Sequence, residues 1–151
     1  MDLKTCTELV QEVARAAGPL SEQSRRQLKI NGKAFRVMPD EHFVFPHGHL
    51  LVEYERNKRP VESISKYWWL QHKSNWLERG QRFALVLLVD SRVSESHAEA
   101  AELLGFELEK RYPETFAFFY AYEPPDGMTA SLIRHIVEQA LVRVKQKVPW
   151  P

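Results

Sequence analysis

Three carboxylates gather in one short stretch of this chain. Asp40 precedes an apolar run, and Glu53 and Glu55 end the next run, with a turn at 46–48 between the two. Carboxylate oxygens are hard ligands that suit Mg²⁺ or Mn²⁺. A segment with helical character, which carries Lys66, follows directly. The stretch therefore indicates a metal-binding carboxylate site on a β-hairpin.

The turn allows the positions of the acids to be compared across the hairpin. If the residues on either side of the turn at 46–48 are paired, Asp40 lies opposite Tyr54, between Glu53 and Glu55. Side chains alternate along a strand, so the two glutamates point the same way. A slip of one residue would still leave the aspartate close to both. Because three like charges repel one another, we predict Mg²⁺ or Mn²⁺ as the cofactor, with the three acids as ligands.

The same acids have a second interpretation. Glutamates on an edge strand are common as solvated residues that discourage aggregation. On that interpretation the strand runs out of the core into water, and the glutamates pair with Arg56 and Lys58. Histidines around the turn add the option of a histidine metal site. We interpret His47 and His49 as ordinary turn residues, because the pairing above separates them from Asp40.

Positive charge is concentrated just after the hairpin. The candidates for contact with a nucleic-acid backbone are Arg56, Lys58, Arg59 and Lys73, and Lys66, Arg79 and Arg82 add to the same region. Neutralising phosphates with such residues is a main source of affinity for DNA. The alternative is an exposed loop and helix face, because lysines and arginines are mostly on surfaces. The whole chain has a net charge of +1, so only a local patch argues for a nucleic-acid partner.

Hydrophobic periodicity predicts the elements that would position these residues. Stripes at helical spacing predict helices over 5–17, over about 61–78, from a Ser94 cap to Gly105, and after an Asp126 cap, with one further helical turn over 21–26. Apolar runs predict strands in QLKI and KAFRV around Asn31-Gly32, and in PDEHFVF, HLLVEYE, FALVLLVD and TFAFFYAY. The run FALVLLVD shows no alternation, which is typical of a strand covered on both faces.

The order of these elements predicts an α/β fold with a mixed central sheet flanked by helices. A chain of 151 residues is most simply one domain, over residues 1–151. The single Cys6 excludes an intramolecular disulfide and a cysteine zinc cluster. No apolar run reaches the ~18 residues of a membrane span, and no secretory signal follows Met1. We therefore expect no membrane partner and a cytoplasmic location.

Pro39-Asp40 leads into one strand of the hairpin, and Glu53-Tyr54-Glu55 ends the other. This pattern resembles the PD-(D/E)xK nuclease superfamily, whose restriction-endonuclease-like core has the order αβββαβ. The superfamily has an aspartate after a proline at its second core strand and an acid-x-lysine triplet on its third. More narrowly, PDEHFVF, LLVEYERN and ISKY are similar to replication-relaxation-type domains of mobile-element proteins, over roughly residues 35–90.

The resemblance implies metal-dependent hydrolysis of DNA phosphodiester bonds. Asp40 and Glu53 would ligate the metal, and Glu55, which stands where the superfamily has its lysine, would assist ligation or act as a base. Some members supply the amine from the next helix. Lys66 stands in that helix and would contact the scissile phosphate. A solvated helix face is the alternative interpretation of Lys66.

Three hypotheses follow for the function. The first is a Mg²⁺-dependent nuclease domain acting on DNA, to which Glu8 or Glu12 of the first helix would add an acid, as in related folds. The second is a catalytically inactive nuclease-fold module that binds DNA or a protein partner, because Glu55 stands at the lysine position. The third is an unrelated α/β enzyme or scaffold with its acids on the surface. A homodimer would suit the first, since a symmetric pair can cut both strands of a duplex.

Overall fold

The computed structural model describes residues 1–18, 20–22, 26–30, 33–35, 37–56, 59–73 and 82–146. The helices are α1 (Leu3–Ala16), α2 (Pro60–Lys73), α3 (Glu95–Arg111) and α4 (Ala130–Lys145). The strands are β1 (Ser21–Glu22), β2 (Lys29–Ile30), β3 (Lys33–Ala34), β4 (Glu41–Phe45), β5 (Gly48–Glu55), β6 (Phe83–Val89) and β7 (Phe116–Tyr122). Among the described residues no helix is long and apolar enough to cross a membrane.

The main sheet is mixed and has the strand order β1-β4-β5-β6-β7. β4 is antiparallel to both of its neighbours, whereas β5, β6 and β7 are parallel. β2 and β3 pair with each other in a separate two-stranded sheet. The structure therefore confirms the predicted α/β fold with a mixed central sheet.

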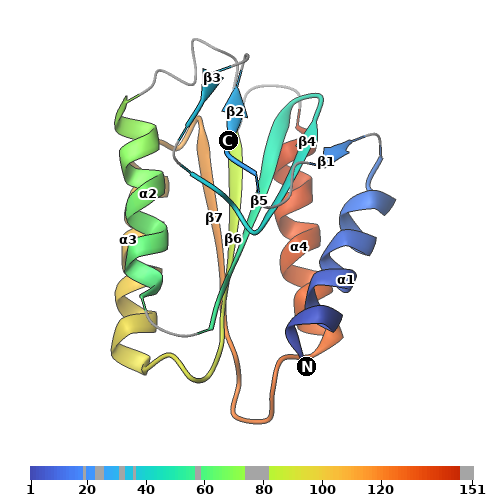
Figure 1. The fold of residues 1–151 in the computed structure, drawn as a ribbon, viewed down its shortest axis with the longest axis vertical. Coiled ribbons are helices and arrows are strands. Elements are labelled where there is room, and N and C mark those ends of the chain that lie inside the picture. The colour runs from blue at the N-terminus through green and yellow to red at the C-terminus, as the bar shows by residue number, and fades with distance from the viewer. Residues whose placement is uncertain are drawn as a thin grey trace.

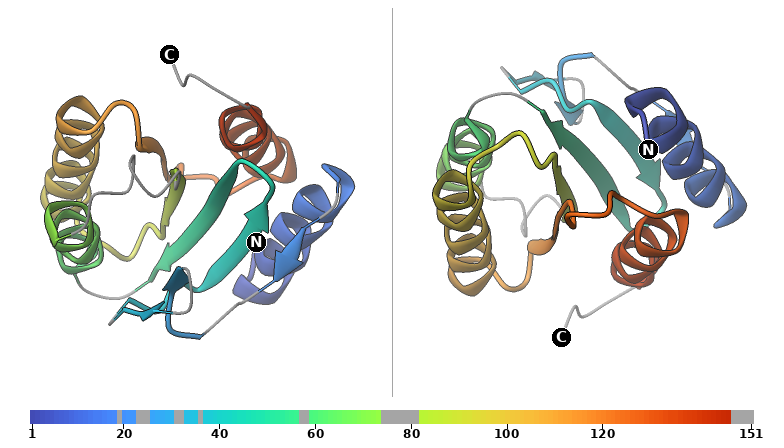
Figure 2. Two further views of the ribbon diagram at one scale, coloured as in Figure 1. Left: turned by 90° about the horizontal axis from the view of Figure 1, so that it is seen from above. Right: turned by 90° about the horizontal axis from the view of Figure 1, so that it is seen from below.

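The helices cover the main sheet on both faces. α2 and α3 lie side by side on one face, and α1 and α4 lie on the other (Figures 1 and 2). Each face has its own apolar core: Phe43, Leu50 and Val86 pack towards α1 and α4, whereas Leu51 and Leu85 pack towards α2 and α3. All seven residues of β6 are buried. This agrees with the absence of alternation in its sequence.

The parallel strands β5, β6 and β7 end at the same edge of the sheet. α2, α3 and α4 begin at this edge, which is towards the bottom of Figure 1. We call it the carboxyl edge. In open α/β sheets, ligands bind beyond the carboxyl ends of the strands. Glu55 at the end of β5 and Asp90 after β6 are acids at this edge.

Several predicted elements are present, and others differ. The strands in PDEHFVF, HLLVEYE, FALVLLVD and TFAFFYAY form as expected. The prediction of a helical turn over 21–26 is wrong at its start, because Ser21 and Glu22 form an edge strand that pairs with Val44 and Phe43 of β4. Arg15 of α1 binds the Glu22 carboxylate through its Nε at 2.6 Å.

The third and fourth helices have bounds that the sequence did not predict. Ser94 caps α3 as expected, but the helix passes through Gly105 and ends at Arg111. Gly105 is buried against β7, where an added Cβ would lie 2.2 Å from the Phe118 ring. The glycine therefore serves close packing instead of ending the helix. Thr129, and not Asp126, caps α4 through a hydrogen bond from the Leu132 N–H.

The helix predicted over 61–78 begins one residue earlier, at Pro60, and its described part ends at Lys73. Residues 74–80, which include the end of that predicted helix, lie outside the described residues, as does the Asn31-Gly32 turn. The two strands on either side of that turn do pair, with Ile30 opposite Lys33. Trp68 of α2 is half-buried and donates to the Leu104 carbonyl at 3.1 Å.

Candidate metal and catalytic site

The hairpin register brings Asp40 beside Glu53. β4 and β5 pair Glu41 with Val52, so the register is one residue away from the expected one and aligns Asp40 with Glu53 instead of Tyr54. The backbone N–H of Tyr54 donates to Oδ2 of Asp40 at 2.8 Å. This bond fixes the aspartate at the start of β4.

Glu53 is a buried acid, with only 4% of its surface exposed. The hydroxyl of Tyr67 on α2 donates to its Oε1 at 2.7 Å, and Tyr67 itself is buried. Burial and the negative charge of Asp40 raise the pKa of Glu53 to about 8, and a hydrogen bond with the Asp40 carboxyl adds to the rise. The Tyr67 hydroxyl and the charge of Lys66 act in the opposite direction on this pKa. At neutral pH Glu53 therefore carries a proton.

Glu55 points to the same face of the sheet as Glu53 but has a separate partner on α2. Ser63 donates to its Oε1. Ser63 and Tyr67 are one turn apart on the helix, a rise of ~6 Å, and Glu55 and Glu53 are two residues apart on the strand, ~6.7 Å. The two spacings match, so α2 supplies one hydroxyl to each glutamate.

Glu55 also lines a surface pocket of about 400 Å³. We call it the Glu55 pocket; it is lined by Tyr54, Glu55, Arg56, Arg59, Glu62, Ser63 and Lys66. Asp40 and Glu53 are not in this lining. Tyr54, whose backbone N–H binds Asp40, does line it. The exposed Lys66 lines the pocket, and its charge acts on Glu53.

The three acids predicted as metal ligands do not form one group among the described residues, and Glu55 has Ser63 as its partner. The described residues contain no group of three or more His, Cys, Asp or Glu side chains that could hold a metal ion. Asp40 and Glu53 form a pair of oxygen donors, which is the number that Mg²⁺ commonly takes from a protein, together with water and phosphate oxygens. A divalent cation would also replace the proton of Glu53 and offset the repulsion between the two acids. The residues present therefore fit Mg²⁺ or Mn²⁺ bound by two carboxylates.

The predicted basic residues do not all lie together. Arg56 forms an ion pair with Asp90 at 3.8 Å, and Arg59 binds Glu62 at 2.9 Å. Both line the Glu55 pocket. Lys73 is exposed at the end of α2. Lys58 and Arg79 lie outside the described residues, and the buried Arg82 donates to the Glu114 carbonyl at 3.2 Å.

The two glutamates of the first helix lie across the sheet from α2. Glu12 forms an ion pair with Arg134 at 3.1 Å, and Glu8 lies 4.0 Å from Lys4. Both side chains are more than half exposed, on a helix that covers the other face. They are therefore not placed to complete the acid pair.

The burial and pairing of two histidines near the turn were not predicted from the sequence. His42 and His49 lie across β4 and β5, with Nε2 of His42 2.9 Å from Nδ1 of His49 and the rings stacked. His49 is thus a buried strand residue and not the turn residue expected. Burial, followed by the charge of His49, lowers the pKa of His42 to about 3. His42 is therefore neutral at physiological pH, and the pair belongs to the interior.

Sequence analysis also missed the roles of Ser63 and Tyr67. Their four-residue spacing opposite an acid-x-acid strand end was the available signal. Comparison of the chain with protein-family models, with curated proteins and with solved structures finds no match.

Proposed function

We propose that the protein is a metal-dependent nuclease-like domain that hydrolyses DNA phosphodiester bonds. The observation that carries the proposal is the pairing of Asp40 with Glu53, with Lys66 close enough to influence the Glu53 charge. The order of α1, the main-sheet strands β1, β4 and β5, α2 and β6 is also helix, three strands, helix, strand. That order is the one expected from the resemblance to the PD-(D/E)xK superfamily and to replication-relaxation-type domains.

Each residue has a role on this proposal. Asp40 and Glu53 would hold Mg²⁺ or Mn²⁺, which supplies charge neutralisation at the phosphate and lowers the pKa of water. Tyr67 keeps the Glu53 carboxyl oriented, and the Tyr54 N–H keeps that of Asp40. Lys66 faces the Glu55 pocket and would contact the non-bridging oxygens of the scissile phosphate. Glu55, held by Ser63, would accept a proton from the attacking water.

The amine comes from the helix because β5 offers none at the end of the hairpin. Glu55 stands where the superfamily has its lysine, and its carboxylate accepts a hydrogen bond from Ser63 of α2. Lys66 and Ser63 are three residues apart on α2, so they project from neighbouring positions of one helix face. This arrangement supports Lys66 as the replacement amine.

Nicking of a supercoiled plasmid tests the proposal. We expect nicking by the purified protein in Mg²⁺ or Mn²⁺, and a loss of about 100-fold or more in Asp40→Asn and Lys66→Met, as for removal of a charge-stabilising group. The matched controls are Asp126→Asn and Lys110→Met, because both side chains are exposed and lie outside the pocket. Activity that survives Asp40→Asn would refute the assignment.

The same experiment addresses the second candidate, an inactive nuclease-fold module. Its supporting observation is that Glu53 holds a proton and that no three-donor metal group occurs among the described residues. Wild-type protein that binds DNA without nicking it in either metal would favour this candidate. Our proposal further includes a cytoplasmic location and a homodimer, which would present two sites to the two strands; sedimentation with and without duplex DNA tests the dimer.

A further inference from the structure

A second pocket adjoins the Glu55 pocket at the carboxyl edge. It has a volume of about 850 Å³ and lies between the start of α2 and the loop that precedes α3. We call it the Arg92 pocket. Arg59 and Glu62 line both pockets, so the two are contiguous. A chain molecule that occupies one can therefore continue into the other.

The lining of the Arg92 pocket combines apolar and cationic side chains. The partly buried Val61 provides accessible apolar surface, and the buried Pro60 and Val93 lie beneath the lining. The guanidinium groups of Arg59 and Arg92 contribute positive charge, and their side chains are 70% and 58% exposed. A nucleotide presents the same combination, with a largely apolar sugar and base and an anionic phosphate.

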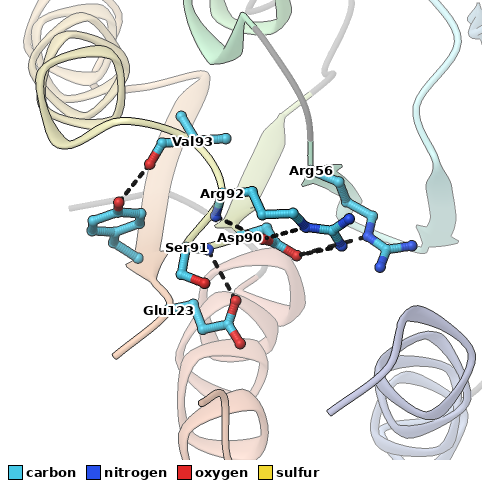
Figure 3. A network of polar contacts seen from close by, with 7 residues as sticks. Arg56, Asp90, Ser91, Arg92, Val93 and Glu123 are labelled. Atoms are coloured by element: carbon cyan, nitrogen blue, oxygen red, sulfur yellow. Dashed lines mark hydrogen bonds and ion pairs between the residues drawn. The ribbon is translucent and has the colours of Figure 1, made fainter. Parts of the chain in front are cut away.

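The loop that carries Arg92 is fixed by its own hydrogen bonds (Figure 3). Asp90 accepts from the Arg92 backbone N–H at 2.8 Å, and its carbonyl accepts from the Val93 N–H at 3.0 Å. Ser91 donates its N–H to Glu123 at 2.9 Å, beyond the end of β7. Tyr122 donates its hydroxyl to the Val93 carbonyl at 2.5 Å. The loop is thus preorganised, which reduces the entropy lost on binding.

The lining of the Arg92 pocket holds two arginines, Arg59 and Arg92, and one acid, Glu62. Arg56 from the end of β5 and Arg92 converge on the one carboxylate of Asp90, as Figure 3 shows. Arg59 has Glu62 as its partner. Each of these arginines therefore has a carboxylate nearby, and Glu123 also acts on Arg92. An arginine that is partly neutralised by one acid still has N–H donors for a phosphate, because it carries five.

We propose that the Arg92 pocket binds a nucleotide of the DNA strand that flanks the scissile phosphate, with the nucleotide's phosphate against Arg59 and Arg92 and its sugar or base on Val61. The inference rests on the proposed function for the choice of DNA. Arg92 is not one of the basic residues that follow the hairpin in the sequence, so the proposal adds a new candidate for contact with DNA. Asp90 is then a positioning residue, which holds the two arginines.

Binding of a short fluorescein-labelled single-stranded oligonucleotide in EDTA tests the inference without cleavage. The variant is Arg92→Gln and its matched control is Arg134→Gln on α4. Each change removes one positive charge and one surface ion pair, with Asp90 at 3.0 Å and with Glu12 at 3.1 Å respectively. We expect Arg92→Gln to raise the Kd about tenfold and to lower the slope of log Kd against log salt by about 0.7. Arg134→Gln should leave both near wild type.

The outcomes separate this inference from the nuclease proposal. Equal Kd values and salt slopes for Arg92→Gln and Arg134→Gln would overturn the inference, whether or not the wild type nicks plasmid. A selective loss in Arg92→Gln, at an unchanged melting temperature, supports the inference even if the wild type nicks nothing. If nicking is lost in Asp40→Asn but oligonucleotide binding is unchanged in Arg92→Gln, the proposed function remains supported and this subsite is refuted.

Discussion

Replacing Tyr67 with phenylalanine tests how α2 controls the acid pair. The change removes one hydroxyl, which donates to Oε1 of Glu53 at 2.7 Å from a fully buried position. The hydrogen bond favours the charged carboxylate and so lowers the pKa of Glu53, against the larger effects of burial and Asp40. A hydrogen bond to a charged group is worth about 1.5 kcal/mol at the low end, and one pKa unit equals about 1.4 kcal/mol. The pKa of Glu53 should therefore rise by about one unit.

Carbon-13 NMR of the side-chain carboxyls in glutamate-labelled protein measures this change directly. Wild-type Glu53 should titrate with a pKa of about 8. In Tyr67→Phe the same resonance should titrate about one unit higher, and the pH at which half of the metal-dependent activity appears should move up with it. Glu53→Gln identifies the resonance by its disappearance.

The matched control is Tyr122→Phe, which also loses one hydroxyl and one hydrogen bond, to the Val93 carbonyl at 2.5 Å. It should leave the Glu53 titration unchanged. A Glu53 pKa that is the same in Tyr67→Phe and in wild type would refute the role given to Tyr67. A pKa near 4.5 in the wild type would refute the account of the buried acid itself.

Further predictions concern stability in metal-free buffer. The pKa of Glu53 is higher in the folded than in the unfolded protein, so its contribution to the free energy of unfolding is present below about pH 4.5 and is lost as pH rises towards about 8. The melting temperature should therefore fall from pH 6.5 to 8, and Glu53→Gln should abolish this fall. The pKa of His42 is about 3 in the folded protein, below its unfolded value, so its contribution to the free energy of unfolding is lost as pH falls below about 6.5. His42→Gln should therefore make the melting temperature less sensitive to acid between pH 6 and 5. Gly105→Ala should lower stability by about 1–2 kcal/mol, because strain at the Phe118 ring outweighs a gain in helix propensity of about 1 kcal/mol. Adding Phe118→Leu should recover part of that loss. Thermal unfolding followed by circular dichroism measures all three effects. A melting temperature that is unchanged by these substitutions would contradict the packing and charge states described.

Local patterns were enough to predict most of the elements that frame the site. The apolar runs before and after the turn at 46–48 predicted β4 and β5, and the stripe over about 61–78 predicted α2. Alternation of side chains along β5 predicted that Glu53 and Glu55 share a face, and both do bind α2. These features depend on neighbours in sequence, which is why sequence analysis found them.

Features that depend on how one element meets another were not predictable in the same way. The hairpin register differs by one residue, because Phe45 pairs with Gly48 at the turn. Gly105 resembles a helix end in the sequence, but the ring of Phe118 on β7 explains it. His49 resembles a turn residue and instead stacks on His42 inside the sheet layer. In each case the partner comes from another element, whose position the local pattern does not contain.

The roles of Ser63 and Tyr67 lie between these two cases. Their four-residue spacing is visible in the sequence, and it matches the two-residue spacing of the acids on β5. What the sequence did not contain was the face that α2 turns towards the strand. That orientation follows from the packing of Ile64 and Leu70 in the core under α2.

The most direct test of a metal site at the acid pair is the number of protons released when the ion binds. Titration calorimetry with Mn²⁺ in buffers of different ionisation enthalpy measures it. If the ion replaces the proton of Glu53, release should be about 0.9 proton per ion at pH 7 and about 0.1 at pH 9, given a pKa of about 8. Asp40→Asn should weaken binding strongly, whereas Asp126→Asn should not. Absence of binding, or binding that releases no proton at pH 7 and does not depend on Asp40, would contradict a metal site at Asp40 and Glu53.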